Sequence, residues 1–120
     1  MQSDRRKYIR FEVPLDVIFK PSRDAVPYST GITRNFSRHG LCIETTSLDM
    51  ELNTNLNLMV KHPGKDIFVA ATGDMVWKQH VGGKWLAGVN IVKMDKEAKS
   101  EILDYAYDVW LEKNINFNSA

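Results

Sequence analysis

The sequence has one cysteine and no long hydrophobic run. Cys42 cannot form an internal disulfide, so a disulfide-stapled fold is excluded, and we expect it to be a small buried side chain. No stretch of about 18 apolar residues is present, and no apolar leader follows Met1. The sequence therefore predicts no membrane span and no secretory signal, and we expect a cytoplasmic protein.

Strong charge, metal-ligand spacing and catalytic motifs are also missing. The net charge is +1, so the chain lacks the broad positive field on which non-specific nucleic-acid binding depends. The three histidines, His39, His62 and His80, lack ligand spacing, which predicts no metal and no cofactor. There is no recognisable Ser-His-Asp or Cys-His arrangement and no P-loop, so we expect a protein that is not an enzyme. Any anion site must be local.

What is present is a series of short β-like segments in a chain of 120 residues, a length that suits one domain. Apolar residues alternate with polar ones in several segments, which is typical of strands with one buried face. Gly73 is expected at a bulge or bend, and Gly82-Gly83 at a hairpin turn. Strands without intervening helices predict an antiparallel barrel or sandwich. The expected strands contain Val13 to Lys20, Tyr28 to Thr33, Gly40 to Thr45, Leu56 to Val60, Ile67 to Lys78 and Trp85 to Ile91.

The pattern becomes helical after Asp95, which is a candidate N-cap. We expect Tyr105 and Trp110 to bury this helix against the barrel, with a partner-binding surface as the alternative. The predicted organisation is a single domain with a basic arm (1–10), a β-barrel (11–93), a C-terminal helix (95–113) and a frayed tail (114–120).

Two segments far apart in the sequence carry chemistry suited to an anionic guanine nucleotide. Arg6 and Arg10 are four residues apart, and each offers a planar fork of donors that can hold a phosphate or the O6/N7 edge of guanine. Later in the chain, Asn35 and Ser37 can accept hydrogen bonds from guanine N1 and N2, and Gly40 lets the backbone approach a flat ring.

Together the pattern R-x-x-x-R followed by [DN]-x-S-x-x-G resembles the signature of PilZ domains, the bacterial receptors for cyclic di-GMP. Arg5 matches the extra arginine that often precedes the first element. The late segments Met75-Val76-Trp77 and Leu86 to Val89 are also similar to that family, so the resemblance spans nearly the whole chain. It implies a six-stranded antiparallel barrel and cyclic di-GMP as ligand, with Trp77 stacking on or bordering the nucleotide.

The resemblance implies a second-messenger switch. Arg6 and Arg10 would meet the phosphates and guanine edges, Arg5 would add a contact, and Asn35 and Ser37 would read a guanine. Gly40 would hold a tight turn, where a positive φ is expected. Repulsion among the basic residues opposes packing of the empty arm, so a bound dianion would clamp it onto the barrel. The output would go to a separate protein, such as motility, pilus or exopolysaccharide machinery of the kind that controls biofilms.

Other interpretations stay open. Asn35, Ser37 and Gly40 are also ordinary turn chemistry. Trp77 could be a core or barrel-rim residue, and His39 could face the ligand or only solvent. A PilZ-fold adaptor that acts without nucleotide, or a barrel that binds single-stranded nucleic acid through aromatic platforms, are the competing functions.

Overall fold

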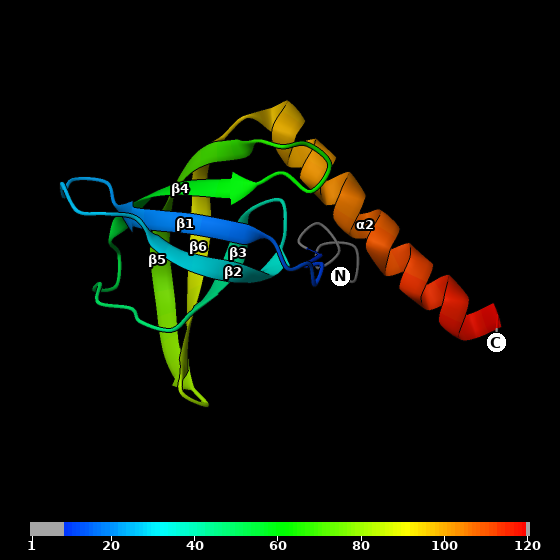
Figure 1. The fold of residues 1–120 in the computed structure, drawn as a ribbon, viewed down its shortest axis with the longest axis horizontal. Helices are drawn as coiled ribbons and strands as arrows, with labels where there is room; N and C mark the ends of the chain where they lie inside the picture. The colour runs from blue at the N-terminus through cyan, green and yellow to red at the C-terminus, as the bar shows by residue number, and fades with distance from the viewer. Residues whose placement is uncertain (1–8, 120) are drawn as a thin grey trace, which may run out of the picture.

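The fold is a closed antiparallel barrel followed by one helix (Figure 1). The computed structural model describes residues 9–119, with their side chains up to residue 114. Around the barrel the strands follow the order β1-β2-β3-β6-β5-β4, so the sheet has no free edge. The predicted six-stranded barrel is confirmed. In chain order the elements are β1 (Asp16–Pro21), β2 (Ser29–Phe36), β3 (Gly40–Thr45), β4 (Asn55–Lys61), β5 (Phe68–Val81), β6 (Lys84–Met94) and α2 (Lys96–Ser119).

The interior of the barrel is filled by alternate side chains from all six strands. Successive residues of a strand point to opposite faces, so an alternating sequence buries one face and leaves the other in water. The residues that face inward are almost completely removed from solvent, and large ones predominate. One from each strand in turn is Phe19, Phe36, Ile43, Leu58, Met75 and Val89, each at most 2% exposed.

The β5–β6 hairpin bends where the glycines predict it. Gly82 and Gly83 have φ values of 56° and 78°, which confirms the hairpin turn. The β5–β6 register shifts between Thr72 and Gly73, which confirms the bulge. β5 continues beyond Lys78, where the predicted strand ended, so the hairpin extends past the rest of the barrel.

The segment before β1 is buried without being a strand. Val13 and Leu15 are almost fully buried, as their alternation predicts, but the ladder begins only at Asp16. Here the hydroxyl of Thr33 donates to the Val13 carbonyl and accepts from the Leu15 amide at 2.8 Å. The Thr33 amide also donates to the Leu15 carbonyl at 2.9 Å. Pro14 has no N–H to offer to a ladder, so one backbone bond and one side chain of β2 together satisfy the backbone here.

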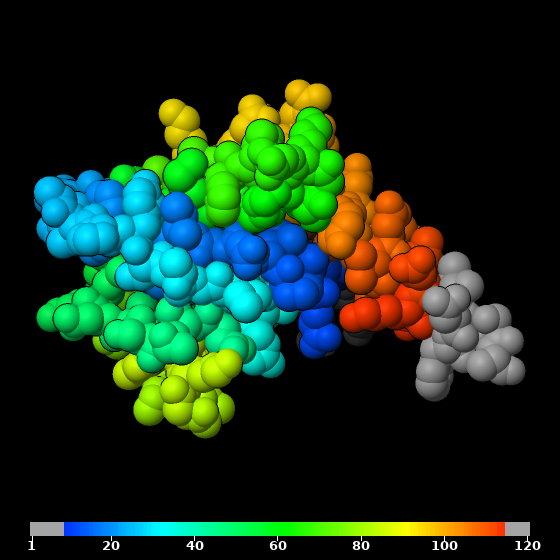
Figure 2. Space-filling model, in the orientation of Figure 1, coloured from blue at the N-terminus to red at the C-terminus, as the bar shows by residue number. Residues whose placement is uncertain are grey.

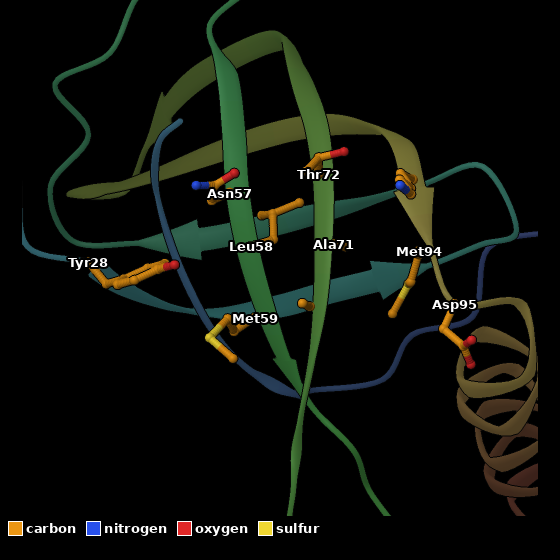
Figure 3. A pocket seen from close by; sticks show the side chains of 10 residues that line it. Tyr28, Asn57, Leu58, Met59, Ala71, Thr72, Met94 and Asp95 are labelled. Atoms are coloured by element: carbon orange, nitrogen blue, oxygen red, sulfur yellow. The ribbon is translucent and has the colours of Figure 1, made fainter. Parts of the chain in front are cut away.

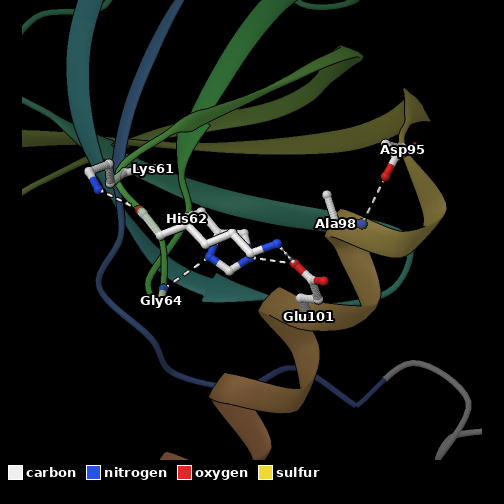
Figure 4. Close-up of polar contacts among 7 residues, drawn as sticks. Lys61, His62, Gly64, Asp95, Ala98 and Glu101 are labelled. Atoms are coloured by element: carbon white, nitrogen blue, oxygen red, sulfur yellow. Dashed lines mark hydrogen bonds and ion pairs between the residues drawn. The ribbon is translucent and has the colours of Figure 1, made fainter.

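The helix begins where the sequence predicts it and ends later. The Asp95 carboxylate accepts from the Ala98 amide at 2.9 Å, so the predicted N-cap is confirmed (Figure 4). The expected tail from residue 114 is wrong, because helical backbone continues to Ser119. None of the helical residues described is part of a segment long and apolar enough to cross a lipid bilayer.

The side chains that bury α2 are not the predicted ones. Ile102 and Ala106 are completely buried, whereas Tyr105 is 42% and Trp110 is 48% exposed. The prediction that these two aromatic residues bury the helix is therefore wrong. Only the first half of α2 lies against the barrel, and the second half extends past it (Figure 1).

A polar cluster joins α2 to the β4–β5 loop (Figure 4). His62 is 6% exposed, and its Nε2 lies 2.8 Å from the Glu101 carboxylate. Its Nδ1 accepts from the Gly64 amide at 3.0 Å, so Nε2 carries the hydrogen and donates to Glu101. Lys65 adds an ion pair to the same carboxylate at 3.2 Å. The cluster ties Glu101, near the start of α2, to the loop that follows β4.

This cluster predicts a pH-dependent contribution to stability. The hydrogen bond from His62, and then that from Lys65, lower the pKa of Glu101 below its ordinary value of 4.5. A carboxyl whose pKa is lowered in the folded state stabilises the fold above its unfolded pKa, and this stabilisation is lost as the pH falls through the folded pKa. Glu101→Gln should therefore be less stable than the parent chain at neutral pH, and the difference should shrink as the pH falls below 4.5.

Urea denaturation at about pH 7 and about pH 3 would measure both differences. Glu112→Gln is the matched control, because Glu112 is exposed on the same helix and has no ion pair among the described residues. An equal pH dependence for the two variants would contradict the role assigned to Glu101.

Candidate functional site

A cleft of about 210 Å³ lies on the outside of the barrel, beside the β2–β3 turn. Its lining includes Arg10, Ser37, Gly40 and Trp77, which come from three distant parts of the sequence. His39 also lines it. The structure thus brings four of the predicted site residues together, and what they bind stays a prediction. Two others, Arg5 and Arg6, lie outside the described residues.

Arg10 is held beside the turn by the residue that follows it. Phe11 and Phe36 exchange two backbone hydrogen bonds of 2.9 Å, and Phe36 immediately precedes Ser37. This short antiparallel bridge fixes the backbone at the base of the arm against the end of β2. The arginine segment and the N-x-S-x-x-G segment therefore meet at one corner of the barrel.

The β2–β3 turn is closed by Ser37. The Ser37 amide donates to the Gly40 carbonyl at 2.8 Å, and the hydroxyl oxygen accepts from the Gly40 amide at 3.2 Å. The hydroxyl also donates to the Gly40 carbonyl at 3.1 Å, and the side chain is 3% exposed. Ser37 thus performs the turn chemistry that the sequence suggests, while direct contact with a ligand stays a prediction.

Gly40 is required for a reason that differs from the expected one. Among the described glycines only Gly82 and Gly83 have positive φ values, so the positive φ expected at Gly40 is wrong. A Cβ at Gly40 would instead lie 2.5 Å from the Val89 carbonyl oxygen. Because that atom belongs to the neighbouring strand, the turn can approach β6 only with glycine. The His39 carbonyl accepts from the Ile91 amide at 2.8 Å and secures this approach.

An outward-facing row of residues crosses four strands beside the cleft. Asn35 pairs with Cys42, Cys42 with Gly88, and Gly88 with Trp77. The chain neighbours of Cys42 on both sides belong to the core, so Cys42 and its partners point away from the interior. A Cβ built on Gly88 would lie 2.0 Å from the indole of Trp77. The ring therefore lies directly on the Gly88 backbone, and its 37% exposure leaves an aromatic surface at the cleft.

Asn35 occupies the far end of this row and carries an unsatisfied atom. It belongs to β2 and not to the bend, which corrects the expected position, because a bulge between Thr33 and Asn35 lets the strand continue to Phe36. Its Oδ1 is buried and has no hydrogen-bond partner among the described residues. Such an acceptor costs about 1–3 kcal/mol if it stays unpaired, and a ligand that donates a hydrogen bond would remove that cost.

Among the residues described, Arg10 contributes an unpaired positive charge to the lining of the cleft. Arg34, on β2, is paired with Glu44 at 2.9 Å, and Lys84 shares that carboxylate at 3.1 Å. Arg10 is exposed and forms no ion pair within the part of the chain that the structure describes. Burial raises the pKa of Cys42, and Arg34 and Arg10 oppose this shift. The guanidinium of Arg10 therefore lies close enough to act electrostatically on Cys42, which is in the same row as Asn35 and Trp77.

Helix α2 supports both halves of the corner. The Lys99 amine donates to the Arg38 carbonyl inside the turn at 3.0 Å. Partial burial lowers the pKa of Lys99, and the charges of Arg38 and Lys96 lower it further. Phe11 packs edge-on against Tyr107, with ring centroids 6.1 Å apart. The same helix thus contacts the base of the arm and the turn.

Sequence reasoning missed three supporting residues. Gly88 lies within the late segment of the resemblance without a role of its own, and no sequence motif includes Phe11 or Lys99. A glycine within an otherwise apolar strand is the one local signal that could have indicated a close approach at Gly88. Phe11 and Lys99 carry no such signal, because their contacts are with residues far away in the sequence.

A larger cavity of about 400 Å³ lies elsewhere and contains none of the predicted site residues (Figure 3). Tyr28, Asn57 and Met59 contribute to its lining. Most of its lining comes from β4, β5 and the end of β6, away from the corner that holds Arg10. No cluster of three His, Cys, Asp or Glu side chains that could hold a metal ion occurs within residues 9–119.

Comparisons with known proteins agree with the fold. A family model described as PilZ domain matches residues 4–108. The structure of the Bacillus subtilis inhibitor of motility, MotI/DgrA, is similar with a TM-score of 0.76 and 18% identity, over 91% of this chain and 53% of that one. This chain thus spans about half of that structure. No curated protein sequence is similar enough to count as a match.

Two structures that include cyclic di-GMP are also similar. The PilZ domain of YcgR from Escherichia coli with c-di-GMP has a TM-score of 0.68 and 10% identity, and 97% of this chain covers 99% of it. The K. pneumonia MrkH–c-di-GMP complex has a TM-score of 0.64 and 13% identity, over 93% of this chain and 55% of that one. At these identities the likeness concerns the fold.

Proposed function

Because this chain belongs to the PilZ domain family, we propose that it is a receptor for cyclic di-GMP and that the nucleotide binds in the cleft beside Arg10. The observation that carries the proposal is the meeting of Arg10, the β2–β3 turn and Trp77 at one cleft. Two structures of the same fold contain cyclic di-GMP, which supports this ligand.

The residues at the corner suit the chemistry of this ligand. The guanidinium of Arg10 can hold a phosphate or the O6/N7 edge of a guanine through paired hydrogen bonds. The exposed indole of Trp77 offers a plane on which a base can stack. Guanine N1 and N2 donate hydrogen bonds, and the unpaired Oδ1 of Asn35, in the same row as Trp77, is an acceptor.

The arm completes the receptor. Arg5 and Arg6 precede Arg10 closely enough to close over a nucleotide held at the corner. Their mutual repulsion is removed when a ligand with two phosphate charges lies between them. Binding then orders the arm, and a separate partner protein recognises the closed form. Motility, pilus and exopolysaccharide machinery are the partner classes that the family membership suggests.

Isothermal titration calorimetry with cyclic di-GMP tests the proposal. Cyclic di-AMP is the matched control, because it keeps both phosphates but lacks the O6 acceptor and the N1 and N2 donors of guanine. We expect saturable binding of cyclic di-GMP, and binding of cyclic di-AMP at least roughly tenfold weaker. Unchanged nucleotide after prolonged incubation would support a receptor and argue against an enzyme.

Two results would overturn the proposal. The absence of heat with cyclic di-GMP would favour an adaptor that acts without nucleotide. Salt-dependent binding of a single-stranded oligonucleotide, together with no response to cyclic di-GMP, would favour a nucleic-acid-binding barrel.

A further inference from the structure

The middle of α2 presents an aromatic surface that the barrel does not cover. Ile102 and Ala106 take up the buried face of the helix, while Tyr107 and Trp110 are 47% and 48% exposed. The two exposed rings stack on each other with centroids 5.9 Å apart. Figure 2 shows the helix protruding from the side of the barrel. Two adjacent large aromatic side chains, left in water and ordered against each other, are typical of a surface that binds another protein.

A line of carboxylates runs along the exposed side of α2, and its first member, Asp104, lies one helical turn before Tyr107. Asp104, Asp108 and Glu112 follow each other at intervals of four residues, so they share one face of the helix. All three are exposed, and none forms an ion pair among the described residues. Like charges at this spacing destabilise a helix by a few tenths of a kcal/mol per pair, and a cationic partner would remove that cost.

The position of this surface connects it to the proposed nucleotide site. Tyr107 contacts Phe11, the residue next to Arg10. One face of the same helix is attached to the turn through the hydrogen bond from Lys99 to the Arg38 carbonyl. A change in the arm or the turn therefore reaches α2 through direct contacts.

We propose that the exposed side of α2 between Asp104 and Glu112 is the docking surface for a segment of a partner protein in which lysine or arginine side chains flank apolar ones. The apolar side chains would cover Tyr107 and Trp110, and the cations would pair with the three carboxylates. The inference rests on the proposed function in that it names the chemistry of the separate partner.

The charge of the three carboxylates disfavours a second copy of the chain, anionic lipid or nucleic acid as the occupant of this surface. A second copy of the chain would bring one line of carboxylates towards another, since the same helix would supply both sides. Anionic lipid and nucleic acid carry the same sign of charge as the carboxylates and would be repelled. A basic and apolar protein segment is the occupant that satisfies the rings and the carboxylates together.

The experiment uses the full chain without nucleotide, so that it can fail independently of cyclic di-GMP binding. The probe is a synthetic amphipathic helical peptide of lysine and leucine, and the control peptide has glutamate in place of each lysine. Binding is measured by NMR titration of the isotope-labelled protein. We expect the lysine peptide to bind, with the largest shift changes in residues 104–112, and the glutamate peptide not to bind.

Charge-reversal variants then test whether the lysine peptide binds at this surface or is attracted to acidic residues anywhere on the protein. Asp104→Lys with Asp108→Lys should weaken binding of the lysine peptide by roughly tenfold or more, a loss of about 1.4 kcal/mol. The matched control, Asp24→Lys with Asp66→Lys, makes the same change in net charge at exposed positions outside the helix and should leave most of the affinity. Trp110→Ala should weaken binding while the helix content seen by circular dichroism is retained.

Several results would overturn the proposal. They are the absence of lysine-peptide binding, equal binding of both peptides, and an equal loss in the two double variants. Partition onto anionic vesicles would indicate a membrane surface, and a dimer in light scattering that Trp110→Ala abolishes would indicate a second copy of the chain.

Discussion

Replacement of Arg10 with alanine is expected to weaken cyclic di-GMP binding by roughly ten- to a hundredfold while thermal melting stays near that of the parent chain. A hydrogen bond to a charged group contributes about 1.5–3 kcal/mol, and each 1.4 kcal/mol corresponds to about tenfold in affinity. Arg10 is exposed, so its removal leaves no buried group unpaired. Calorimetry would give the affinity, and a thermal melt would show that the fold is unchanged.

Two further variants distinguish the geometry of the guanidinium from its charge. Arg10→Lys keeps the charge but loses the planar fork, so it should restore only part of the affinity. Arg23→Ala removes an exposed arginine from the turn after β1 and should leave the affinity unchanged. If Arg10→Ala binds as tightly as the parent chain, or if Arg23→Ala loses as much, the nucleotide does not bind at this corner.

Substitution of Thr33 with valine should lower the free energy of unfolding more than substitution of any exposed residue. The Thr33 side chain is 1% exposed, and its hydroxyl satisfies both the Val13 carbonyl and the Leu15 amide. Valine has the same shape but no hydroxyl, so both backbone groups would be buried without a partner. At about 1–3 kcal/mol for each group, the loss is roughly 2–6 kcal/mol, a large fraction of the 5–15 kcal/mol typical of a domain.

Urea denaturation and a thermal melt would measure this loss, and the melting temperature should fall by on the order of 10 °C. Thr33→Ser is the matched control, because it keeps the hydroxyl and removes only a methyl group. It should be clearly more stable than Thr33→Val. A smaller loss for valine than for serine would mean that packing of the methyl group, and not the two hydrogen bonds, holds the segment before β1.

The barrel and the start of the helix could be predicted because their signals are local. Alternation of apolar residues marks the strands, Gly82 and Gly83 mark the hairpin, and Asp95 marks the N-cap. Each of these features depends on residues within a few positions of one another. The paired segments of the family signature could also be recognised, because their residue types and spacing are visible in the chain.

The errors occurred where a distant residue decides the local outcome. Gly40 is required by the Val89 carbonyl of another strand and not by its own φ value. Asn35 remains in β2 because of a bulge against β3. Tyr105 is exposed although its neighbour Ala106 is completely buried, so its side chain faces away from the barrel, and Trp110 lies where the helix extends past the barrel. None of these causes lies near the affected residue in the sequence.

The one-dimensional pattern specified six strands, one helix and the residue types of an anion site, because periodicity and turn chemistry act between neighbours along the chain. Packing of the barrel, the base of the arm and the helix decided which of those residues meet. It placed Arg10 beside the β2–β3 turn, laid Trp77 on Gly88 and left the aromatic face of α2 uncovered. Such contacts arise from packing between segments far apart in the sequence, and a local pattern carries no information about them.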